Sequence, residues 1–140
     1  MNIEIATASM ATDRRPEYFK GARLRVGISG CEYVGLPLGL RFAEAGHRVI
    51  GFDTDSAKVG KLNRGETYIE HIPQNKIQQF VQAKSVPIDP KMLAGYDCVL
   101  IATDHTSYDY PAIVESSQLV VDTRNATRHI VRHRDKLVLV

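Results

Sequence analysis

The sequence has few cysteines and no long apolar run, and neither sign of charge dominates it. Two cysteines, Cys31 and Cys98, occur in 140 residues without a CxxC or other ligand spacing, which argues against a disulfide framework or a cysteine metal site. Apolar runs such as Cys98 to Ala102 are far too short to span a membrane. The net charge of +2 is too small to indicate nucleic-acid binding. We therefore expect a cytoplasmic globular protein without a membrane or nucleic-acid partner.

Short apolar segments alternate with helical patterns after residues 1–22, which we interpret as a poorly ordered leader. Because parallel neighbours need crossover connections, this alternation predicts an α/β protein. We expect residues 23–140 to form a single Rossmann-like domain with a doubly wound, mainly parallel five-stranded sheet in the order 2-1-3-4-5. The five predicted strands are residues 24–30, 49–53, 97–102, 119–123 and 136–140.

Helix signals lie between these strands. Residues 31–48 carry an apolar stripe, with Pro37 near the start and Gly46 suited to the C-cap. Asp55 and Asp89 are suited to N-caps, the latter before a proline. A helix of about three turns is predicted within residues 31–48, and further helices over residues 56–63, 72–84, 90–93 and 110–115. The prolines of SVPIDP indicate a junction at residues 84–90.

The first strand ends in a glycine turn of the kind that binds dinucleotides. Such a site needs a tight turn, a close approach of the backbone to the pyrophosphate and a helix N-terminus. Gly30 and Gly35 occupy the positions of the first and third glycines, and Asp53 ends the second strand where an acid binds the ribose hydroxyls. The alternative is that this turn and Asp53 are kept only for packing.

Two stretches resemble one family of enzymes. Residues 30–73, GCEYVGLPLGLRFAEAGHRVIGFDTDSAKVGKLNRGETYIEHIP, resemble the start of the nucleotide-sugar 6-dehydrogenases of the UDP-glucose/GDP-mannose type. Within them, YIEHIP is most similar to the branch that acts on UDP-N-acetylhexosamines such as UDP-N-acetylglucosamine. Residues 96–128 are similar to the C-terminal UDP-binding domain of that family. The resemblance implies an NAD-binding half, residues 23–83, joined to a UDP-binding-domain-like half, residues 91–140, with the central domain missing.

The resemblance implies NAD-dependent oxidation of the sugar 6-hydroxyl to a carboxylate, in polysaccharide biosynthesis, through a thiohemiacetal on a cysteine in a Gly-rich motif. That motif is absent, so no catalytic residue is assigned. Lys58 matches a basic residue that reaches the adenosine ribose, and Arg124 matches an arginine that contacts the UDP-sugar. Lys58 could instead be simply solvated, and Arg124 could pair with Asp122 or Asp104. The implied cofactor-binding residues are Gly30, Cys31, Glu32, Tyr33, Val34, Gly35, Asp53 and Lys58.

Glu32 departs from the family pattern because it stands where the middle glycine is expected. A carboxylate about 4 Å from a phosphate charge costs on the order of 4 kcal/mol at an effective dielectric of 20, although rotation of the side chain into water relieves much of it. We therefore expect NAD binding to be weak or lost.

Three hypotheses remain open. The first is a truncated nucleotide-sugar dehydrogenase homologue without activity alone, retaining at most some binding of NAD or a UDP-sugar. The second is an active enzyme completed by another chain. The third is a non-catalytic interaction module, for which a sheet edge at Lys136 to Val140 would favour homo-oligomers. His129 and His133 lack a third ligand, so no metal site is predicted.

Overall fold

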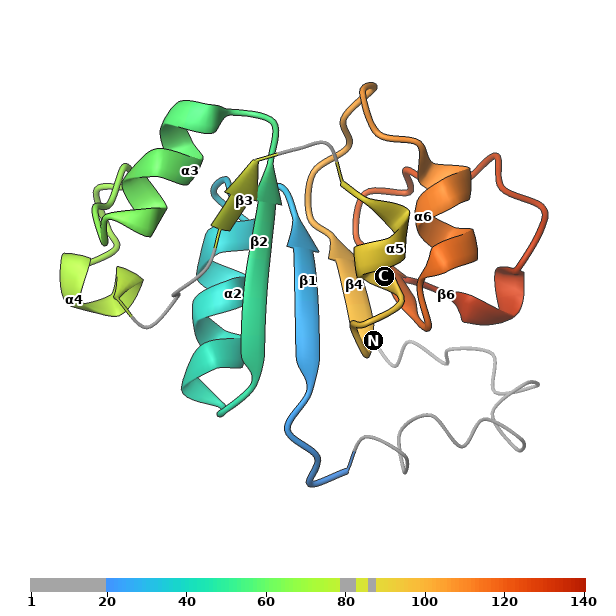
Figure 1. Cartoon of the computed structure of the whole chain (residues 1–140), viewed down its shortest axis with the longest axis horizontal. Helices are drawn as coiled ribbons and strands as arrows, with labels where there is room; N and C mark the ends of the chain where they lie inside the picture. The colour runs from blue at the N-terminus through green and yellow to red at the C-terminus, as the bar shows by residue number, and fades with distance from the viewer. Residues whose placement is uncertain (1–19, 79–82, 86–87) are drawn as a thin grey trace, which may run out of the picture.

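The computed structural model describes residues 20–78, 83–85 and 88–140. Most of the predicted leader therefore lies outside the described residues. The structure is a six-stranded, wholly parallel sheet in the order β3-β2-β1-β4-β5-β6, with helices on both faces (Figure 1). The strands are β1 Arg25–Ser29, β2 Arg48–Asp53, β3 Ala83–Ser85, β4 Cys98–Ile101, β5 Val120–Asp122 and β6 Leu137–Leu139.

The predicted doubly wound fold is confirmed, and the five predicted strands occur in the predicted order. β1 pairs with β4 from Val26 opposite Cys98 to Ser29 opposite Ile101, so the segments on either side of residues 84–90 share one continuous sheet. Parallel neighbouring strands are connected by crossovers, usually helices, that pack on the faces of the sheet. This explains why strands and helices alternate in the sequence.

The sheet has one strand more than predicted. β3 pairs with Gly51 to Asp53 of β2 at the sheet edge, where the sequence had predicted the end of a helix and the start of a junction. The prediction was wrong at Ala83–Ser85 because AKS carries no apolar pattern, and the pairing depends on backbone groups that β2 offers along its edge.

Helix ends follow the capping signals. The Asp55 carboxylate accepts hydrogen bonds from the N–H groups of Ala57 and Lys58, and that of Asp89 accepts one from Lys91, so both predicted N-caps are confirmed. The helix predicted over 72–84 is only four residues long in the described part, and residues 79–82 of the predicted range lie outside the described residues. The helices are α2 Gly35–Glu44, α3 Ser56–Asn63, α4 Gln74–Ile77, α5 Pro90–Leu93, α6 Tyr110–Ser116 and the 3-10 turn η2 Arg134–Lys136.

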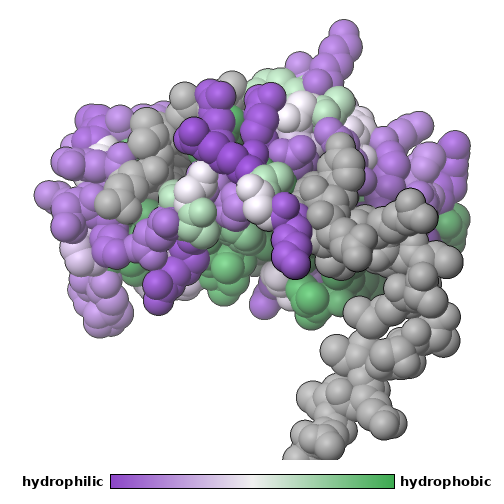
Figure 2. Space-filling model, turned by 90° about the horizontal axis from the view of Figure 1, so that it is seen from below, coloured by the Kyte–Doolittle hydropathy of each residue, from purple (hydrophilic) through white to green (hydrophobic). Residues whose placement is uncertain are grey.

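The core lies on both faces of the sheet. Alternate residues of a strand point to opposite faces, so Val49 packs with α2 and α3, whereas Ile50 packs with α5 and α6. The same division separates Leu100 from Val99 in β4. Figure 2 shows the molecule from below the view of Figure 1, where the described side chains are mostly hydrophilic. The opposite end, at the carboxyl ends of the strands, is where parallel sheets of this kind bind ligands.

Candidate functional site

The turn after β1 has two glycines that no other residue could replace without movement. Gly30 has a φ of +91°, and a Cβ there would lie 2.4 Å from Thr103 Oγ1 in the loop after β4. A Cβ on Gly35 would lie 1.7 Å from the carbonyl oxygen of Gly30. The turn therefore folds back against the start of α2 so closely that only hydrogen fits between them.

The same turn aims the N-terminus of α2 at the carboxyl end of β1. Val34 is the N-cap, and no side chain caps this ten-residue helix. The first N–H groups of a helix and its dipole favour an anion at such a place. β1 lies between β2 and β4, where the strand order reverses, which is the usual ligand position in open parallel sheets. A glycine turn followed by an uncapped helix N-terminus is the arrangement that a dinucleotide pyrophosphate requires.

Asp53, predicted to bind the ribose hydroxyls, lies beneath the turn at the end of β2. The residue is buried, at 1% exposure. Oδ2 accepts a hydrogen bond of 2.8 Å from the N–H of Cys31, and Oδ1 accepts one of 2.9 Å from the N–H of Asp55. Asp53 thus ties the phosphate turn to the entry of α3.

Glu32 does not stand alone in the turn, because Lys58 of α3 pairs with it. Lys58 Nζ donates to Glu32 Oε1 at 2.6 Å, with side-chain exposures of 28% and 41%. This hydrogen bond raises the pKa of Lys58 above its ordinary value, and the nearby Asp53 and Asp55 carboxylates add to the effect. The Glu32 carboxylate is therefore held toward α3, and the charge of Lys58 balances its own. From the sequence we expected the Glu32 side chain to reduce its repulsion of a phosphate by rotating into water.

A pocket of about 390 Å³ opens beside this ion pair. Tyr68 closes one side of it, with its hydroxyl donating to the carbonyl oxygen of Cys31. Burial raises the pKa of the Tyr68 hydroxyl, so it stays a neutral donor. Sequence analysis missed Tyr68, although it lies in the YIEHIP segment that carries the family resemblance. The lining residues are Glu32, Tyr33, Asp55, Ala57, Lys58, Lys61, Tyr68 and Ile69.

Neither cysteine is an activated thiol. Burial, with a smaller contribution from Asp53, raises the pKa of Cys31 to about 12. Burial likewise raises the pKa of Cys98 to about 11. The thiolate is the nucleophilic form, and burial opposes its formation at both cysteines near neutral pH.

Arg124 lies far along the sheet from this pocket. It follows β5, which is separated from β1 by β4, and it is exposed. Its backbone N–H donates to Asp122 Oδ1 at 2.9 Å, and Arg128 makes the 3.7 Å ion pair with Asp104. Asp122 also accepts hydrogen bonds from the N–H and hydroxyl of Thr127, at 2.8 Å and 2.7 Å. This loop is thus ordered around Asp122.

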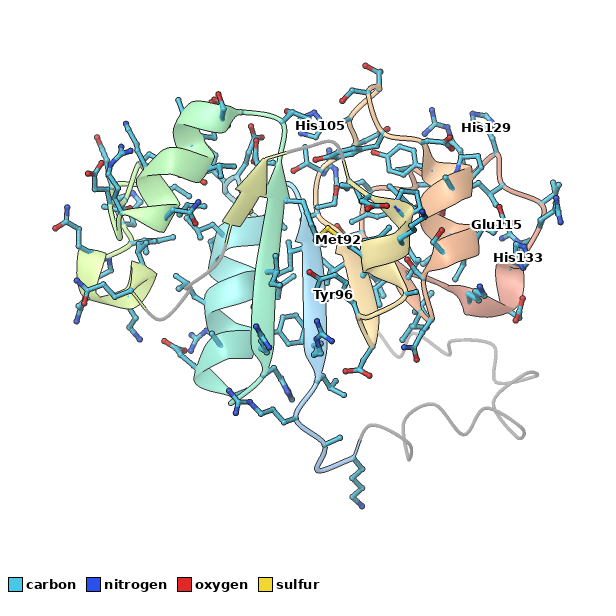
Figure 3. The ribbon with its side chains drawn as sticks, in the orientation of Figure 1. Met92, Tyr96, His105, Glu115, His129 and His133 are labelled. Atoms are coloured by element: carbon cyan, nitrogen blue, oxygen red, sulfur yellow. The ribbon has the colours of Figure 1, made fainter. Side chains whose placement is uncertain are left out.

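The three histidines labelled in Figure 3, His105, His129 and His133, lie apart from one another. His105 follows β4 at the carboxyl end of the sheet, and its ring packs edge-on against Tyr108 with centroids 5.4 Å apart. His129 and His133 lie beyond α6. Within residues 20–78, 83–85 and 88–140, no group of three or more His, Cys, Asp or Glu side chains could hold a metal ion. In the same ranges, no helix is long and apolar enough to cross a membrane.

Comparison with solved structures supports the fold. GDP-mannose dehydrogenase from Pseudomonas aeruginosa superposes with a TM-score of 0.62 at 18% identity, over 83% of this chain and 35% of that one. UDP-D-ManNAc dehydrogenase from Pyrococcus horikoshii gives a TM-score of 0.61 at 19% identity, over 83% and 35%. This chain thus spans about a third of the length of these structures.

Sequence comparison defines the family. UDP-N-acetyl-D-mannosamine dehydrogenase from Pyrococcus horikoshii is 37% identical over 46 residues, which are 33% of this chain and 11% of that protein. A profile described as the UDP-glucose/GDP-mannose dehydrogenase family, NAD binding domain, matches residues 24–107. The matched range extends past the predicted junction and into the loop after β4. The match covers more than half of the sequence, and this chain therefore belongs to the UDP-glucose/GDP-mannose dehydrogenase family, with the NAD-binding domain at residues 24–107.

Proposed function

We propose that this protein binds NAD in the pocket beside the β1–α2 turn. The observation that carries the proposal is the Gly30–Gly35 turn, which leads directly into the uncapped N-terminus of α2 inside the range matched by the NAD-binding domain. Backbone N–H groups from Glu32 to Gly35 would face the pyrophosphate. Lys58 would lie beside the adenosine ribose, in the pocket that it lines. NAD supplies a hydride acceptor when bound, and this chain's residues hold and orient it.

We further propose that the chain does not oxidise a nucleotide sugar by itself. Oxidation through a thiohemiacetal needs a thiolate, and the pKa values of about 12 for Cys31 and about 11 for Cys98 keep both thiols protonated. Both are unpaired, which fits a reducing cytoplasm. The chain would then bind the cofactor only, and the nucleophile for the reaction would have to come from another chain.

The substrate class that we favour is the UDP-N-acetylhexosamines. Its support is the 37% identity to a protein named UDP-N-acetyl-D-mannosamine dehydrogenase. Arg124, exposed after β5, is our candidate contact for the UDP-sugar. The remaining alternatives are an enzyme completed by another chain and an interaction module whose partners pair with the exposed β6 edge.

Titration calorimetry with NAD tests the proposal, and NADH absorbance in the presence of UDP-N-acetylglucosamine or UDP-N-acetylmannosamine tests the alternative enzyme. We expect NAD to bind with a Kd weaker than about 1 µM, which corresponds to about 8 kcal/mol, because the cofactor must share Lys58 with Glu32. We expect no NADH from the chain alone. Absence of NAD binding would contradict the first proposal, and steady NADH production by the chain alone would contradict the second.

A further inference from the structure

We propose that Glu32, rather than Asp53, is the carboxylate that recognises the adenosine ribose, and that it sets a preference for NAD over NADP. The inference rests on the proposed dinucleotide binding. In sites of this kind an acid at the end of the second strand accepts hydrogen bonds from the ribose hydroxyls, and a cation there accommodates a 2′-phosphate instead. Here the acid at that position is turned inward.

Asp53 is poorly placed to meet a ligand. At 1% exposure it is covered by the turn and the start of α3. Its two oxygens already accept backbone hydrogen bonds of 2.8 Å and 2.9 Å from Cys31 and Asp55. A ribose hydroxyl would have to open these contacts, and a buried carboxylate that loses its donors is strongly disfavoured.

Glu32, unlike Asp53, lines the pocket itself. Its side chain crosses from the turn to α3, where Oε1 accepts from Lys58 Nζ at 2.6 Å, and both residues line the pocket. Asp55 also lines the pocket, but its Oδ1 accepts from the N–H groups of Ala57 and Lys58 as the N-cap of α3. Backbone N–H groups hold the carboxylates of Asp53 and Asp55, whereas the Lys58 side chain holds that of Glu32.

The cations of the pocket explain why the preference depends on Glu32. Lys58 and Lys61 both line the pocket, and a 2′-phosphate would be attracted to them. Glu32 neutralises Lys58 and repels the phosphate, so it opposes NADP while accepting a hydrogen bond from the hydroxyl of NAD. Removing this single negative charge leaves Lys58 and Lys61 to face the ligand, with Asp55 held as the N-cap of α3. The residue that departs from the family's glycine pattern would thus define cofactor choice.

The test is titration of NAD and NADP into the full chain and its Glu32→Gln, Lys58→Met and Asp53→Asn variants. Glu66→Gln is the matched control, because it removes a carboxylate paired with Arg64 at 2.9 Å, outside the pocket lining. We expect the wild type to prefer NAD. Glu32→Gln should shift the ratio of the two affinities toward NADP by about fivefold, the equivalent of about 1 kcal/mol for one partly exposed charge pair. Lys58→Met should lower the affinity for NADP below that of the wild type, and Glu66→Gln should leave the ratio of the two affinities unchanged.

The outcomes separate this inference from the function on which it rests. NAD binding with the same preference in wild type and Glu32→Gln would overturn the role of Glu32, as would a shift seen in Asp53→Asn alone. Glu32 is partly exposed, so its variant should fold and the comparison stays informative. Failure of NAD to bind to both wild type and Glu32→Gln would overturn the proposed function together with the inference.

Discussion

At the scale of single residues, the phosphate turn depends on Gly35. Its hydrogen faces the carbonyl oxygen of Gly30, where a Cβ would approach to 1.7 Å. Both partners are backbone atoms, so neither can rotate away. By contrast, a Cβ on Gly60 in α3 would meet the end of the flexible Arg64 side chain at 3.2 Å. Two glycines on neighbouring helices therefore differ in what they tolerate.

Gly35→Ala should lower the free energy of unfolding by more than about 2 kcal/mol, because the added methyl forces the turn away from α2. It should also abolish NAD binding. The matched Gly60→Ala should raise stability by about 0.5–1 kcal/mol through better helix propensity and leave binding intact. Urea unfolding and NAD calorimetry measure both effects. Equal stability of the two variants would contradict the geometry described for the turn.

At the scale of elements, the loop after β5 is organised by Asp122. Its carboxylate accepts hydrogen bonds from Thr127 and from the N–H of Arg124. Burial opposes ionisation, but these hydrogen bonds prevail and hold the pKa of Asp122 below its ordinary 3.8. Because the folded pKa is lowered, the stabilisation is complete above the unfolded value and is lost as pH falls through the folded pKa.

Thr127→Val removes the hydroxyl donor at 2.7 Å and keeps the shape of the side chain. It should cost about 1.5–3 kcal/mol at pH 7, as expected for a hydrogen bond to a charged group. The loss should shrink below pH 3.8, where Asp122 becomes protonated in the unfolded state and then in the folded state. Thr106→Val, at an exposed loop position, is the control and should change stability by less than about 0.5 kcal/mol. A pH-independent cost in Thr127→Val would refute the role of Asp122.

Local signals in the sequence predicted the elements that local chemistry determines. Asp55 and Asp89 cap the predicted helices, and Gly46 takes a φ of +90° after α2. β3 could not be predicted, because three residues of mixed polarity form a strand only when a free sheet edge lies beside them. Single helices and strands with clear local signals can thus be predicted from the sequence, whereas the pairing of an edge strand depends on the assembled sheet.

The candidate site shows the same limit between distant residues. Glu32 and Lys58 were each singled out from sequence, but for separate roles, since 26 positions divide them. Only the packing of α3 beside the turn brings their charges to 2.6 Å. From the sequence we expected Asp53 to face the ribose. In the structure the N–H groups of Cys31 and Asp55 hold it inward, and their positions depend on the folded turn.

At the scale of the whole molecule, the strand order places the candidate site. β1 pairs with β2 on one side and β4 on the other, and the chain reverses its direction of winding between them. The turn, α3 and Tyr68 surround the pocket on the β2 side, whereas Arg124 lies on the far side of β4. Homo-oligomerisation through the β6 edge, with Leu139 and Val140 exposed, stays a prediction.

The most direct test of the central claim is to map NAD on the protein by amide NMR. The account predicts that NAD shifts the backbone signals of Gly30–Gly35 and of Lys58 and Tyr68, around the pocket that these residues form. Signals of α6 and β6, which lie beyond β4 as seen from β1 (Figure 1), should stay in place and serve as the internal control. Shifts confined to α6 and β6, or no shifts at saturating NAD, would contradict the account.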